Sequence, residues 1–455
     1  MDLYLGLDFG TSGARAVIID TKGAIHTEAH YLFSDSQVAV APSAAQQQST
    51  PAELPNLWQR ALFALIEQIP PAMRRVVSAI AIDGTSATVL LCDANGNPVR
   101  TPILYNEARV EVMEELTAIA PPNHPVLTAT SSLAKLLWWL TTDVTENQPS
   151  SLFSPATVSG IAASNEPLYF LHQADWLAFL LHGKLGISDY HNALKLGYDV
   201  ATLSYPNWLT SAIARYSQRM ALQLPEIITP GTPVGEVTAE MCDRFDFPNN
   251  CRVCAGTTDS IAAFFASGAQ SPGEASTSLG STLAVKLLSH TRVDDARYGI
   301  YSHRFGDLWL VGGASNTGGA VLRKFFTDAE LANLSSKINP ATNTCLDYYP
   351  LLKPGDRFPI NDPNLPPRLE PRPTNSVEFL QGLLESIARL EARGYQLLQE
   401  FGSTPLTRVY TAGGGAKNPA WTAIRQRYLK VPVVTPVHTA AAYGAALLAM
   451  RGVNH

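Results

Sequence analysis

A turn near the start of the sequence combines one carboxylate, two hydroxyl groups and two glycines. It spans residues 8–13 (DFGTSG) between two apolar runs, a pattern that predicts a β-hairpin. Small residues leave backbone N–H groups uncovered, so these groups and the hydroxyls of Thr11 and Ser12 suit phosphate oxygens. The carboxylate of Asp8 repels phosphate unless a divalent cation lies between them, which predicts Mg²⁺ beside Asp8. An ordinary hairpin, whose Asp and Thr bond to their own turn, explains the same residues.

A second turn of this kind lies in the other half of the chain. Residues 274–288 (EASTSLGSTLAVKLL) again predict a strand, a turn of small and hydroxyl residues, and a strand. Two such hairpins, one near the start of each half, indicate a duplicated domain. Three consecutive glycines (413–415) then follow a predicted strand, before Asn418 and Pro419 mark the start of a helix. Glycines let the backbone come close to a flat or anionic ligand.

Carboxylates also stand at strand ends. Asp259 follows Thr257 and Thr258, after the buried strand predicted over residues 251–256. A kinase that acts on an alcohol needs a carboxylate close to the attacking hydroxyl, and Asp259 is our candidate for this base. The alternative is that Asp259 only caps the helix that begins at Ser260, and spacing alone slightly favours that alternative.

The strand predicted over residues 76–82 leads into another turn, DGTS, at positions 83–86. Sheets of α/β proteins collect ligands at strand ends, although Ser86 can equally bond its own turn. The sequence has no GxxxxGK[ST] motif, and its glycine run is not GxGxxG, so a P-loop protein and a dinucleotide fold lack support. Phosphoryl transfer explains the turns best: two of them hold a polyphosphate, the glycine turn holds a nucleoside and a carboxylate deprotonates the acceptor.

Composition bounds the class of protein. The 455 residues are 46% hydrophobic and 16% charged, which is typical of a soluble globular chain of two domains. A net charge of −6 without a basic run argues against nucleic-acid and membrane-surface partners. We find neither a signal-peptide pattern nor a run of apolar residues long enough to span a bilayer.

Five cysteines, an odd number spread over the chain, favour a reducing compartment, and we expect a cytoplasmic protein. Cys251 and Cys254 form a CxxC pair without a second pair or a His cluster. Their segment predicts a buried strand rather than a zinc or redox site.

The remaining pattern predicts the elements that must position these turns. Helices are expected over residues 56–69, 132–140, 173–181, 261–267, 375–401, 420–429 and 440–450. Polar, irregular segments predict surface excursions over residues 34–55, 142–167 and 353–373. The Pro- and Gly-bearing segment 230–237 predicts the domain junction, which divides the chain into domains 1–235 and 236–455.

These motifs, in their order, resemble those of the FGGY-type carbohydrate kinases. They read LGLDFGTSGARAVIID, ILYNEARV, SLAKLLWWL, QADWLAFLLHGKLGISDYHNALKLGYD, AGTTDSIAAFFASG, SLGSTLAVK, GGASNTGG and TAGGGAKNPAW. They run from Leu3 to about Ala449, although Thr130 and Trp139 depart from the usual pattern around Lys135. The resemblance implies an α/β fold of two ribonuclease-H-like domains, of the actin and sugar-kinase type, around a central cleft. It also implies ATP- and Mg²⁺-dependent phosphorylation of a sugar or polyol hydroxyl.

The resemblance assigns roles to residues that match the family's motifs. Asp8 resembles the carboxylate on the metal and substrate side, and Asp259 aligns with the catalytic base rather than with a mere helix cap. Thr11 and Ser12 resemble the turn that faces the γ-phosphate. The remaining assignments are Ser278, Gly280, Ser281 and Thr282 to the second phosphate motif, and Gly414 and Asn418 to the adenosine motif.

The segment GTSAT at residues 84–88 stands where typical xylulose and glycerol kinases carry a Gln- or His-bearing segment. With DFGTSGARA and SDYHNALKLGYD, it is similar to the pentulose-kinase branch that acts on D-ribulose. The sugar-binding residues implied are Asp8, Ser12, Gly13, Ala14, Arg15, Ser86 and Asp259. The alternatives are xylulose or another polyol as substrate and, in a different class, an ATP-driven switch of the actin or chaperone kind.

Overall fold

The computed structural model describes residues 2–35, 53–142, 166–216 and 220–453. Two compact units make up the chain: unit 1 comprises Met1–Ala266 together with Ala440–His455, and unit 2 comprises Ser267–Thr439. The chain leaves unit 1 once and returns to it with its last helix. The boundary expected at 235/236 therefore falls inside unit 1, where strand β10 (Pro233–Glu236) belongs to the central sheet.

A six-stranded sheet of order β10-β11-β4-β1-β2-β3 forms the centre of unit 1. Its other strands are β1 (Leu3–Phe9), β2 (Gly13–Asp20), β3 (Ile25–Leu32), β4 (Val77–Gly84) and β11 (Arg252–Thr258). β1 runs antiparallel to β2 but parallel to β4, and β11 also runs parallel to β4. The carboxyl ends of β1, β4 and β11 therefore meet at one edge of the sheet.

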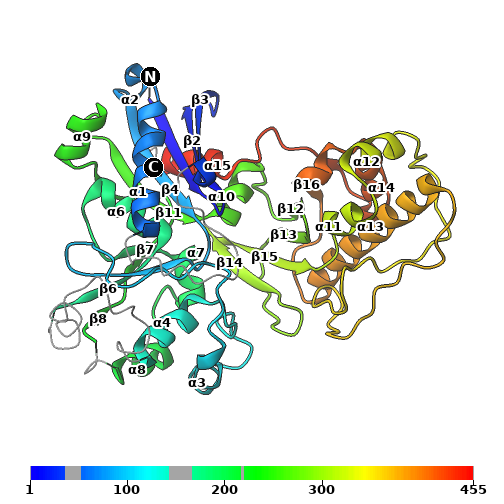
Figure 1. Cartoon of the computed structure of the whole chain (residues 1–455), viewed down its shortest axis with the longest axis horizontal. Helices are drawn as coiled ribbons and strands as arrows, with labels where there is room; N and C mark the ends of the chain where they lie inside the picture. Colours follow the sequence, from blue (N-terminus) through cyan, green and yellow to red (C-terminus); the bar gives the residue numbers. More distant parts are fainter. Residues whose placement is uncertain (1, 36–52, 143–165, 217–219, 454–455) are drawn as a thin grey trace. The chain divides into compact units, whose positions relative to one another are not determined.

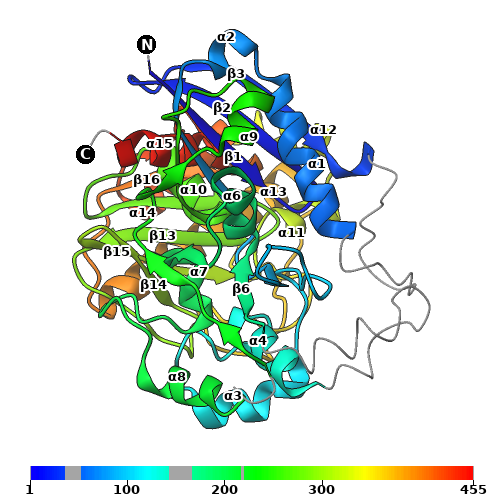
Figure 2. The same ribbon diagram turned by 90° about the vertical axis from the view of Figure 1, so that its left-hand side faces the viewer.

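Both faces of this sheet are covered. Leu3, Leu5, Leu7 and Phe9 alternate along β1 and pack in one core with residues of α1 (Glu53–Gln68) and α6 (Gln173–His182). Figure 2 shows α1 lying along β2 and β3, which it contacts.

The C-terminal helix α15 (Ala441–Val453), red in Figure 1, lies against β1 at the start of the chain. Gly6 permits this approach, because a Cβ there would lie 2.0 Å from the Ala442 carbonyl oxygen. Helix α10 (Asp259–Ala266) packs on α15, and Gly444 makes the same kind of close contact with Ala262. The last helix thus completes the face of the sheet opposite α1.

A smaller part of unit 1 follows the end of β4. A three-stranded sheet joins β5 (Val89–Cys92), β6 (Leu168–His172) and β8 (Leu222–Gln223). Helices α3 (Met113–Ile119), α4 (Ser132–Thr141) and α8 (Asn207–Ala214) contribute to apolar cores beside it. Short elements β7 (Ile187–Asp189), α7 (Tyr190–Ala193) and β9 (Glu226–Ile228) connect this part to β11.

Unit 2 contains a second six-stranded sheet, of order β14-β15-β13-β12-β16-β17. Its strands are β12 (Glu274–Leu279), β13 (Leu283–Ser289), β14 (Tyr301–Phe305), β15 (Leu308–Ser315), β16 (Arg408–Ala412) and β17 (Val433–Val434). As in unit 1, an antiparallel hairpin (β12 and β13) adjoins a parallel strand (β16). This agreement is what the duplicated hairpin pattern predicted.

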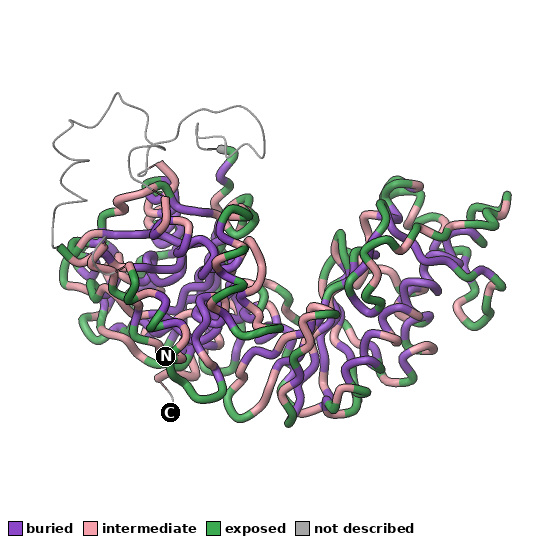
Figure 3. The backbone as a smooth tube through the Cα atoms, turned by 90° about the horizontal axis from the view of Figure 1, so that it is seen from below, coloured by how far each residue is buried: buried purple, intermediate pink, exposed green. Residues whose placement is uncertain are grey.

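Unit 2, whose residues 267–439 are all described, also contains four α-helices. They are α11 (Gly319–Phe325), α12 (Asp328–Ser335), α13 (Ser376–Glu400) and α14 (Pro419–Leu429). α13 contacts both α12 and α14, and its buried residues are spread along its length. Figure 3 shows that buried residues, in purple, run through the interior of each unit.

The observed elements lie close to the expected ones. The expected helix 375–401 is α13, and the Asn375 side chain caps it by accepting a hydrogen bond from the Val377 N–H at 2.9 Å. Residues 36–52 and 143–165, which make up most of two expected surface excursions, lie outside the described residues.

In the ranges given above, no helix is both long and apolar enough to cross a bilayer. Cys251 and Cys254 are buried, and burial raises the pKa of Cys254 to about 12.

Candidate active site

Two aspartates stand side by side at the strand-end edge of the sheet in unit 1. Asp8 on β1 and Asp83 on β4 are register partners on neighbouring parallel strands. Asp83 is completely buried, and neither of its carboxylate oxygens accepts a hydrogen bond from an N–H or O–H group within the described parts of the chain. Instead its carboxyl lies within hydrogen-bond reach of the carboxyl of Asp8. Two carboxyl groups this close form such a bond only when one of them keeps its proton.

The electrostatics of this pair follow from burial and neighbours. Burial raises the pKa of Asp83 well above its ordinary value, and the charges of Asp8 and Asp259 raise it further. Burial also raises the pKa of Asp8, an effect that the hydrogen bond from Asp83 and the charge of Arg15 oppose. Arg15 is the register partner of Asp8 on β2. The shared proton therefore belongs on Asp83, which leaves Asp8 as the charged member.

Asp259 forms the third corner of this group of carboxylates. It is the first residue of α10, directly after β11, whose Thr257 pairs with Asp83. Its carboxylate accepts a hydrogen bond from the Ser260 N–H at 2.6 Å, so it does serve the first turn of the helix. Its charge also raises the pKa values of both Asp8 and Asp83. The structure thus brings the two predicted catalytic residues to one sheet edge and adds Asp83 to them.

The turn after β1 has the predicted exposed hydroxyls. Thr11 and Ser12 are exposed, and the turn is closed by a hydrogen bond from the Gly10 N–H to the Gly13 carbonyl at 3.0 Å. Gly13 is required by close packing, since a Cβ there would lie 2.4 Å from the Tyr31 carbonyl oxygen. Ala14, by contrast, is buried in the core, so its side chain has no place at the surface.

The turn at residues 84–88 follows Asp83. Gln173, at the start of α6, accepts hydrogen bonds from the N–H and the hydroxyl of Thr85, both at 3.0 Å. Thr85 and Thr88 also join their hydroxyls at 2.6 Å. These threonines and Ala87 are buried, so Ser86 is the partly exposed side chain of this stretch.

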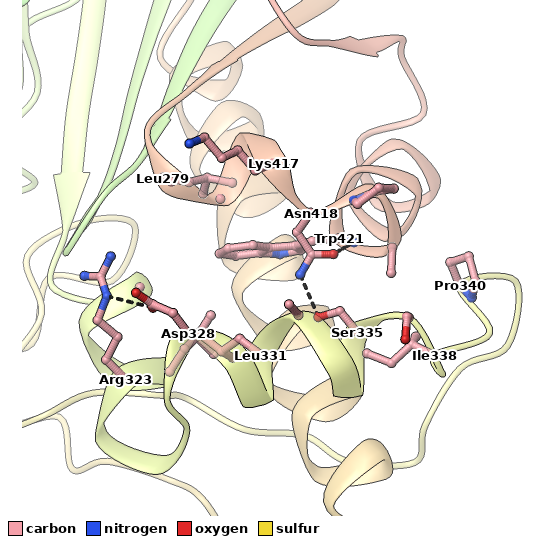
Figure 4. Close-up of a pocket in the computed structure, with 18 of the residues that line it drawn as sticks. Leu279, Arg323, Asp328, Leu331, Ser335, Ile338, Pro340, Lys417, Asn418 and Trp421 are labelled. Atoms are coloured by element: carbon pink, nitrogen blue, oxygen red, sulfur yellow. Dashed lines mark hydrogen bonds and ion pairs between the residues drawn. The ribbon is translucent and has the colours of Figure 1, made fainter.

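Unit 2 contains a separate cavity of about 800 Å³ beside its two predicted turns (Figure 4). Of the residues assigned to the second phosphate motif and the adenosine motif, Gly280, Gly414 and Asn418 line this cavity, while Ser278, Ser281 and Thr282 are exposed and do not line it. The Gly280 and Ser281 carbonyls accept hydrogen bonds from Gly319 and Ala320, at the start of α11.

The walls of the cavity are largely apolar. Four apolar side chains line it: Leu322 on α11, Leu331 on α12, Ile338 in the segment after α12, and Trp421 on α14. Its rim carries Lys417 and the Arg323–Asp328 ion pair, with a 3.7 Å separation, visible in Figure 4. A concave apolar pocket of this size with a few polar groups is typical of a site for a flat organic ligand.

Asn418 is held from both sides. Its side-chain amide donates to the Ser335 hydroxyl at 2.8 Å, and its side-chain oxygen caps α14 by accepting from the Trp421 N–H at 3.0 Å. Gly415 packs closely beneath, where a Cβ would lie 2.7 Å from both Leu279 and Trp421. Hydrogen bonds and close packing therefore hold the glycine turn in place at the edge of the cavity.

The residues present fit a magnesium ion that takes most of its ligands from elsewhere. No cluster of three or more His, Cys, Asp or Glu side chains able to hold a metal occurs in the part of the chain described. Mg²⁺, however, commonly uses one or two carboxylates and completes its shell with water and phosphate oxygens. Asp8 offers such a carboxylate beside the buried oxygens of Asp83.

Comparison with known proteins identifies the family. The model for the N-terminal domain of the FGGY family of carbohydrate kinases matches residues 3–266, and the model for its C-terminal domain matches residues 275–453. The chain is 21% identical to a xylulose kinase of Staphylococcus epidermidis, over 100% of this chain and 88% of the relative.

Solved structures confirm the predicted two-domain α/β sugar-kinase fold. The crystal structure of a xyloylose kinase from Brucella ovis matches with a TM-score of 0.79 at 22% identity, over 99% of this chain and 90% of that one. The structure of Plasmodium falciparum glycerol kinase with ADP gives a TM-score of 0.77 at 17% identity, over 100% of this chain and 90% of that one. The chain belongs to the FGGY family of carbohydrate kinases, enzymes that use ATP to phosphorylate sugars.

Proposed function

We propose that this protein transfers the γ-phosphoryl group of ATP to D-ribulose, giving D-ribulose 5-phosphate and ADP. The observation that carries the proposal is the convergence of Asp8, Asp83 and Asp259 at one sheet edge of unit 1. Phosphoryl transfer to an alcohol needs a carboxylate that orients the hydroxyl and accepts its proton, and this edge supplies charged carboxylates for it.

In the proposed reaction Asp259 accepts the proton of the attacking hydroxyl. It follows β11 as the first residue of α10, so its carboxylate lies at the same sheet edge as Asp8 and Asp83, and the oxygen that accepts from the Ser260 N–H fixes its orientation. Asp8 orients the sugar and is the residue that would hold a magnesium ion, which would neutralise charge on the phosphates. Thr11 and Ser12 donate hydroxyl hydrogen bonds to the γ-phosphate.

The cavity of unit 2 is proposed to hold the nucleotide. Its volume of about 800 Å³ and its apolar walls suit a purine and ribose, and its glycine-lined edge suits the phosphates. Gly280, Ser281 and Thr282 contact the phosphates in this proposal, while Gly414 and Asn418 contact the adenosine. A structural neighbour, the Plasmodium falciparum glycerol kinase, was solved with ADP, which supports a nucleotide as a ligand of this protein.

The choice of a pentulose rests on the turn at residues 84–88. Of its side chains, Ser86 alone is partly exposed, because Thr85, Ala87 and Thr88 are buried. The sugar therefore meets a small hydroxyl here instead of a long Gln or His side chain. Ser86, Arg15 and the backbone around Gly13 complete the proposed sugar site.

A substrate panel tests the proposal. ADP release is measured with D-ribulose, D-xylulose, L-ribulose, ribitol and glycerol, with wild-type protein and with Asp259→Asn. We expect the highest kcat/KM with D-ribulose and a kcat about 10²–10⁴-fold lower in the variant at an unchanged KM for ATP. The relative from Staphylococcus epidermidis is a xylulose kinase. A higher kcat/KM with D-xylulose than with D-ribulose would contradict the proposal that D-ribulose is the substrate. ATP hydrolysis that no sugar changes would contradict the kinase and indicate an ATP-driven switch.

A further inference from the structure

A buried lysine contacts the turn that carries Ser86. Lys135 lies on α4, and its side chain is completely buried. Its Nζ donates to the Ala87 carbonyl at 2.6 Å and to the Leu104 carbonyl at 2.7 Å. An amine is costly to bury unless hydrogen bonds replace its water, and two carbonyls at these distances do so. Lys135 thus joins two segments that are 17 residues apart in the chain.

The residue it holds has an unfavourable backbone conformation. Ala87 has a φ of 65°, in the left-handed region that non-glycine residues rarely adopt. Residues are kept in this region when the surrounding structure determines their position, and such residues cluster at ligand sites. The hydrogen bond from Lys135 to the carbonyl of Ala87 is a direct restraint on that conformation.

The second segment is restrained as well. The Leu104 N–H donates to the Glu107 carboxylate at 2.9 Å, and the Tyr105 N–H donates to the Thr88 hydroxyl at 3.0 Å. The Gln173 N–H donates to the Thr88 carbonyl at 3.0 Å. The backbone on the C-terminal side of Ser86 is therefore held by several hydrogen bonds, and Lys135 contributes the two to the Ala87 and Leu104 carbonyls.

We propose that Lys135 is a positioning residue for sugar selectivity, because it fixes the left-handed Ala87 and so presents Ser86 to the bound pentulose. The inference rests on the proposed function, in which Ser86 contacts the sugar. It predicts that loss of the amine weakens sugar binding and selectivity, while the nucleotide site in unit 2 and the catalytic carboxylates are unaffected.

Three variants and a control separate this role from a merely structural one. Lys135→Met keeps the length of the side chain and removes its donors. Ala87→Gly lowers the free-energy cost of the left-handed conformation. In the double variant it should therefore partly restore the sugar binding that Lys135→Met weakens. Lys184→Met is the control, because Lys184 Nζ also donates to one carbonyl, that of Val234 at 2.6 Å, but is exposed and on another segment.

We expect Lys135→Met to raise the KM for D-ribulose about tenfold and to narrow its preference over D-xylulose, with kcat and the KM for ATP within about twofold of wild type. In the double variant the KM for D-ribulose should fall part of the way back to the wild-type value. The KM of Lys184→Met should equal that of wild type. Folding is checked by thermal unfolding of each variant. If Lys135→Met does not fold, Thr88→Val, which removes the hydroxyl that accepts from Tyr105, must show the same selective rise in KM.

The outcomes distinguish the two proposals. A wild-type protein that prefers another sugar overturns the D-ribulose assignment, and the same KM comparison is then made with that sugar. A folded Lys135→Met whose KM for the preferred sugar equals that of Lys184→Met overturns the role of Lys135 alone. So does a Thr88→Val variant with an unchanged KM when Lys135→Met is unfolded. A wild-type protein that phosphorylates no sugar overturns both proposals.

Discussion

The carboxyl groups of Asp8 and Asp83 lie within hydrogen-bond reach of each other, as register partners on the parallel strands β1 and β4. Because burial keeps the proton on Asp83, an amide at this position can replace it as a donor to Asp8. We expect Asp83→Asn to reduce kcat by less than about tenfold. Asp8→Asn should reduce kcat by about 10²-fold or more, because Asp8 is the charged member of this pair. Steady-state kinetics with the preferred sugar measure both. Equal losses in the two variants would show that Asp83 is ionised in the working enzyme.

A second prediction concerns the cavity of unit 2. Ala332 on α12 is exposed and lines the cavity, so a larger side chain there fills the cavity without disturbing the core. We expect Ala332→Phe to raise the KM for ATP about tenfold or more, with the KM for the sugar unchanged. Ala329→Phe is the matched control, because Ala329 is exposed on the same helix and does not line the cavity. Equal nucleotide affinity in the two variants would place the nucleotide elsewhere.

A third prediction concerns a buried ion pair between helices α13 and α14 of unit 2. Arg425 on α14 donates from Nε and Nη2 to Glu391 on α13 at 2.6 and 2.7 Å, and both side chains are fully buried. Thr277 on β12 and Thr411 on β16 bond to the same pair. Removal of one partner leaves a buried charge, so we expect Arg425→Met to lower the free energy of unfolding by about 3–5 kcal/mol.

The exposed pair Arg393–Glu400, on the same helix α13, is the control for this prediction. Its N–O distance is 2.7 Å, but both partners reach solvent. Arg393→Met should therefore cost less than about 1 kcal/mol in urea unfolding. The double variant Arg425→Met/Glu391→Leu should recover much of the loss, because no charge is then left unpaired. Similar losses for Arg425→Met and Arg393→Met would contradict this account of the buried pair.

A fourth prediction is a dependence of stability on pH. Burial raises the pKa of Asp189, the N-cap of α7, to about 7, although hydrogen bonds from Asn192 and His191 oppose the shift. The folded protein then holds a proton that the unfolded chain has released. This contribution to stability is therefore complete below about pH 4 and is lost as the pH rises to about 7, by at most about 1.4 kcal/mol per pH unit.

Asp189→Asn removes this titration and keeps an oxygen that can cap α7. We expect the difference in unfolding free energy between the variant and wild type to grow in favour of the variant from pH 4 to pH 7. Urea unfolding at several pH values measures it. A difference that is constant with pH would mean that Asp189 titrates alike in the folded and unfolded chains.

Local patterns predicted much of the fold and of the candidate site. Each hairpin turn shows in the sequence as small and hydroxyl residues between two apolar runs, so Asp8, Thr11 and Ser12 could be found from their neighbours alone. Asp259 could be found as a carboxylate after a buried strand, but spacing could not separate base from cap. The structure explains why, since its carboxylate does bond the first turn of α10.

What the sequence could not supply depends on contacts between distant segments. Asp83 was seen at a strand end, but its partnership with Asp8 follows from the register between strands about 75 residues apart. Two parallel strands that both end in Asp are a signal that could have found it. The cavity walls from α11 and α12 escaped notice because ordinary apolar residues form them. The Pro- and Gly-bearing segment predicted to be the domain junction contains strand β10 of the central sheet, which pairs with β11, so unit 1 continues to Ala266. The return of α15 to unit 1 was a separate miss, because each domain was assumed to be one continuous stretch.

The return of α15 to β1 sets an order of events during synthesis of the protein. Residues 267–439 form a continuous stretch that can fold as soon as it leaves the ribosome, since domains generally fold as units. The face of β1 around Gly6 is covered by residues of α15, which come after unit 2 in the chain. A nascent chain arrested before residue 440 can therefore contain a folded unit 2 while β1, the strand that carries Asp8, still lacks the helix that packs on it.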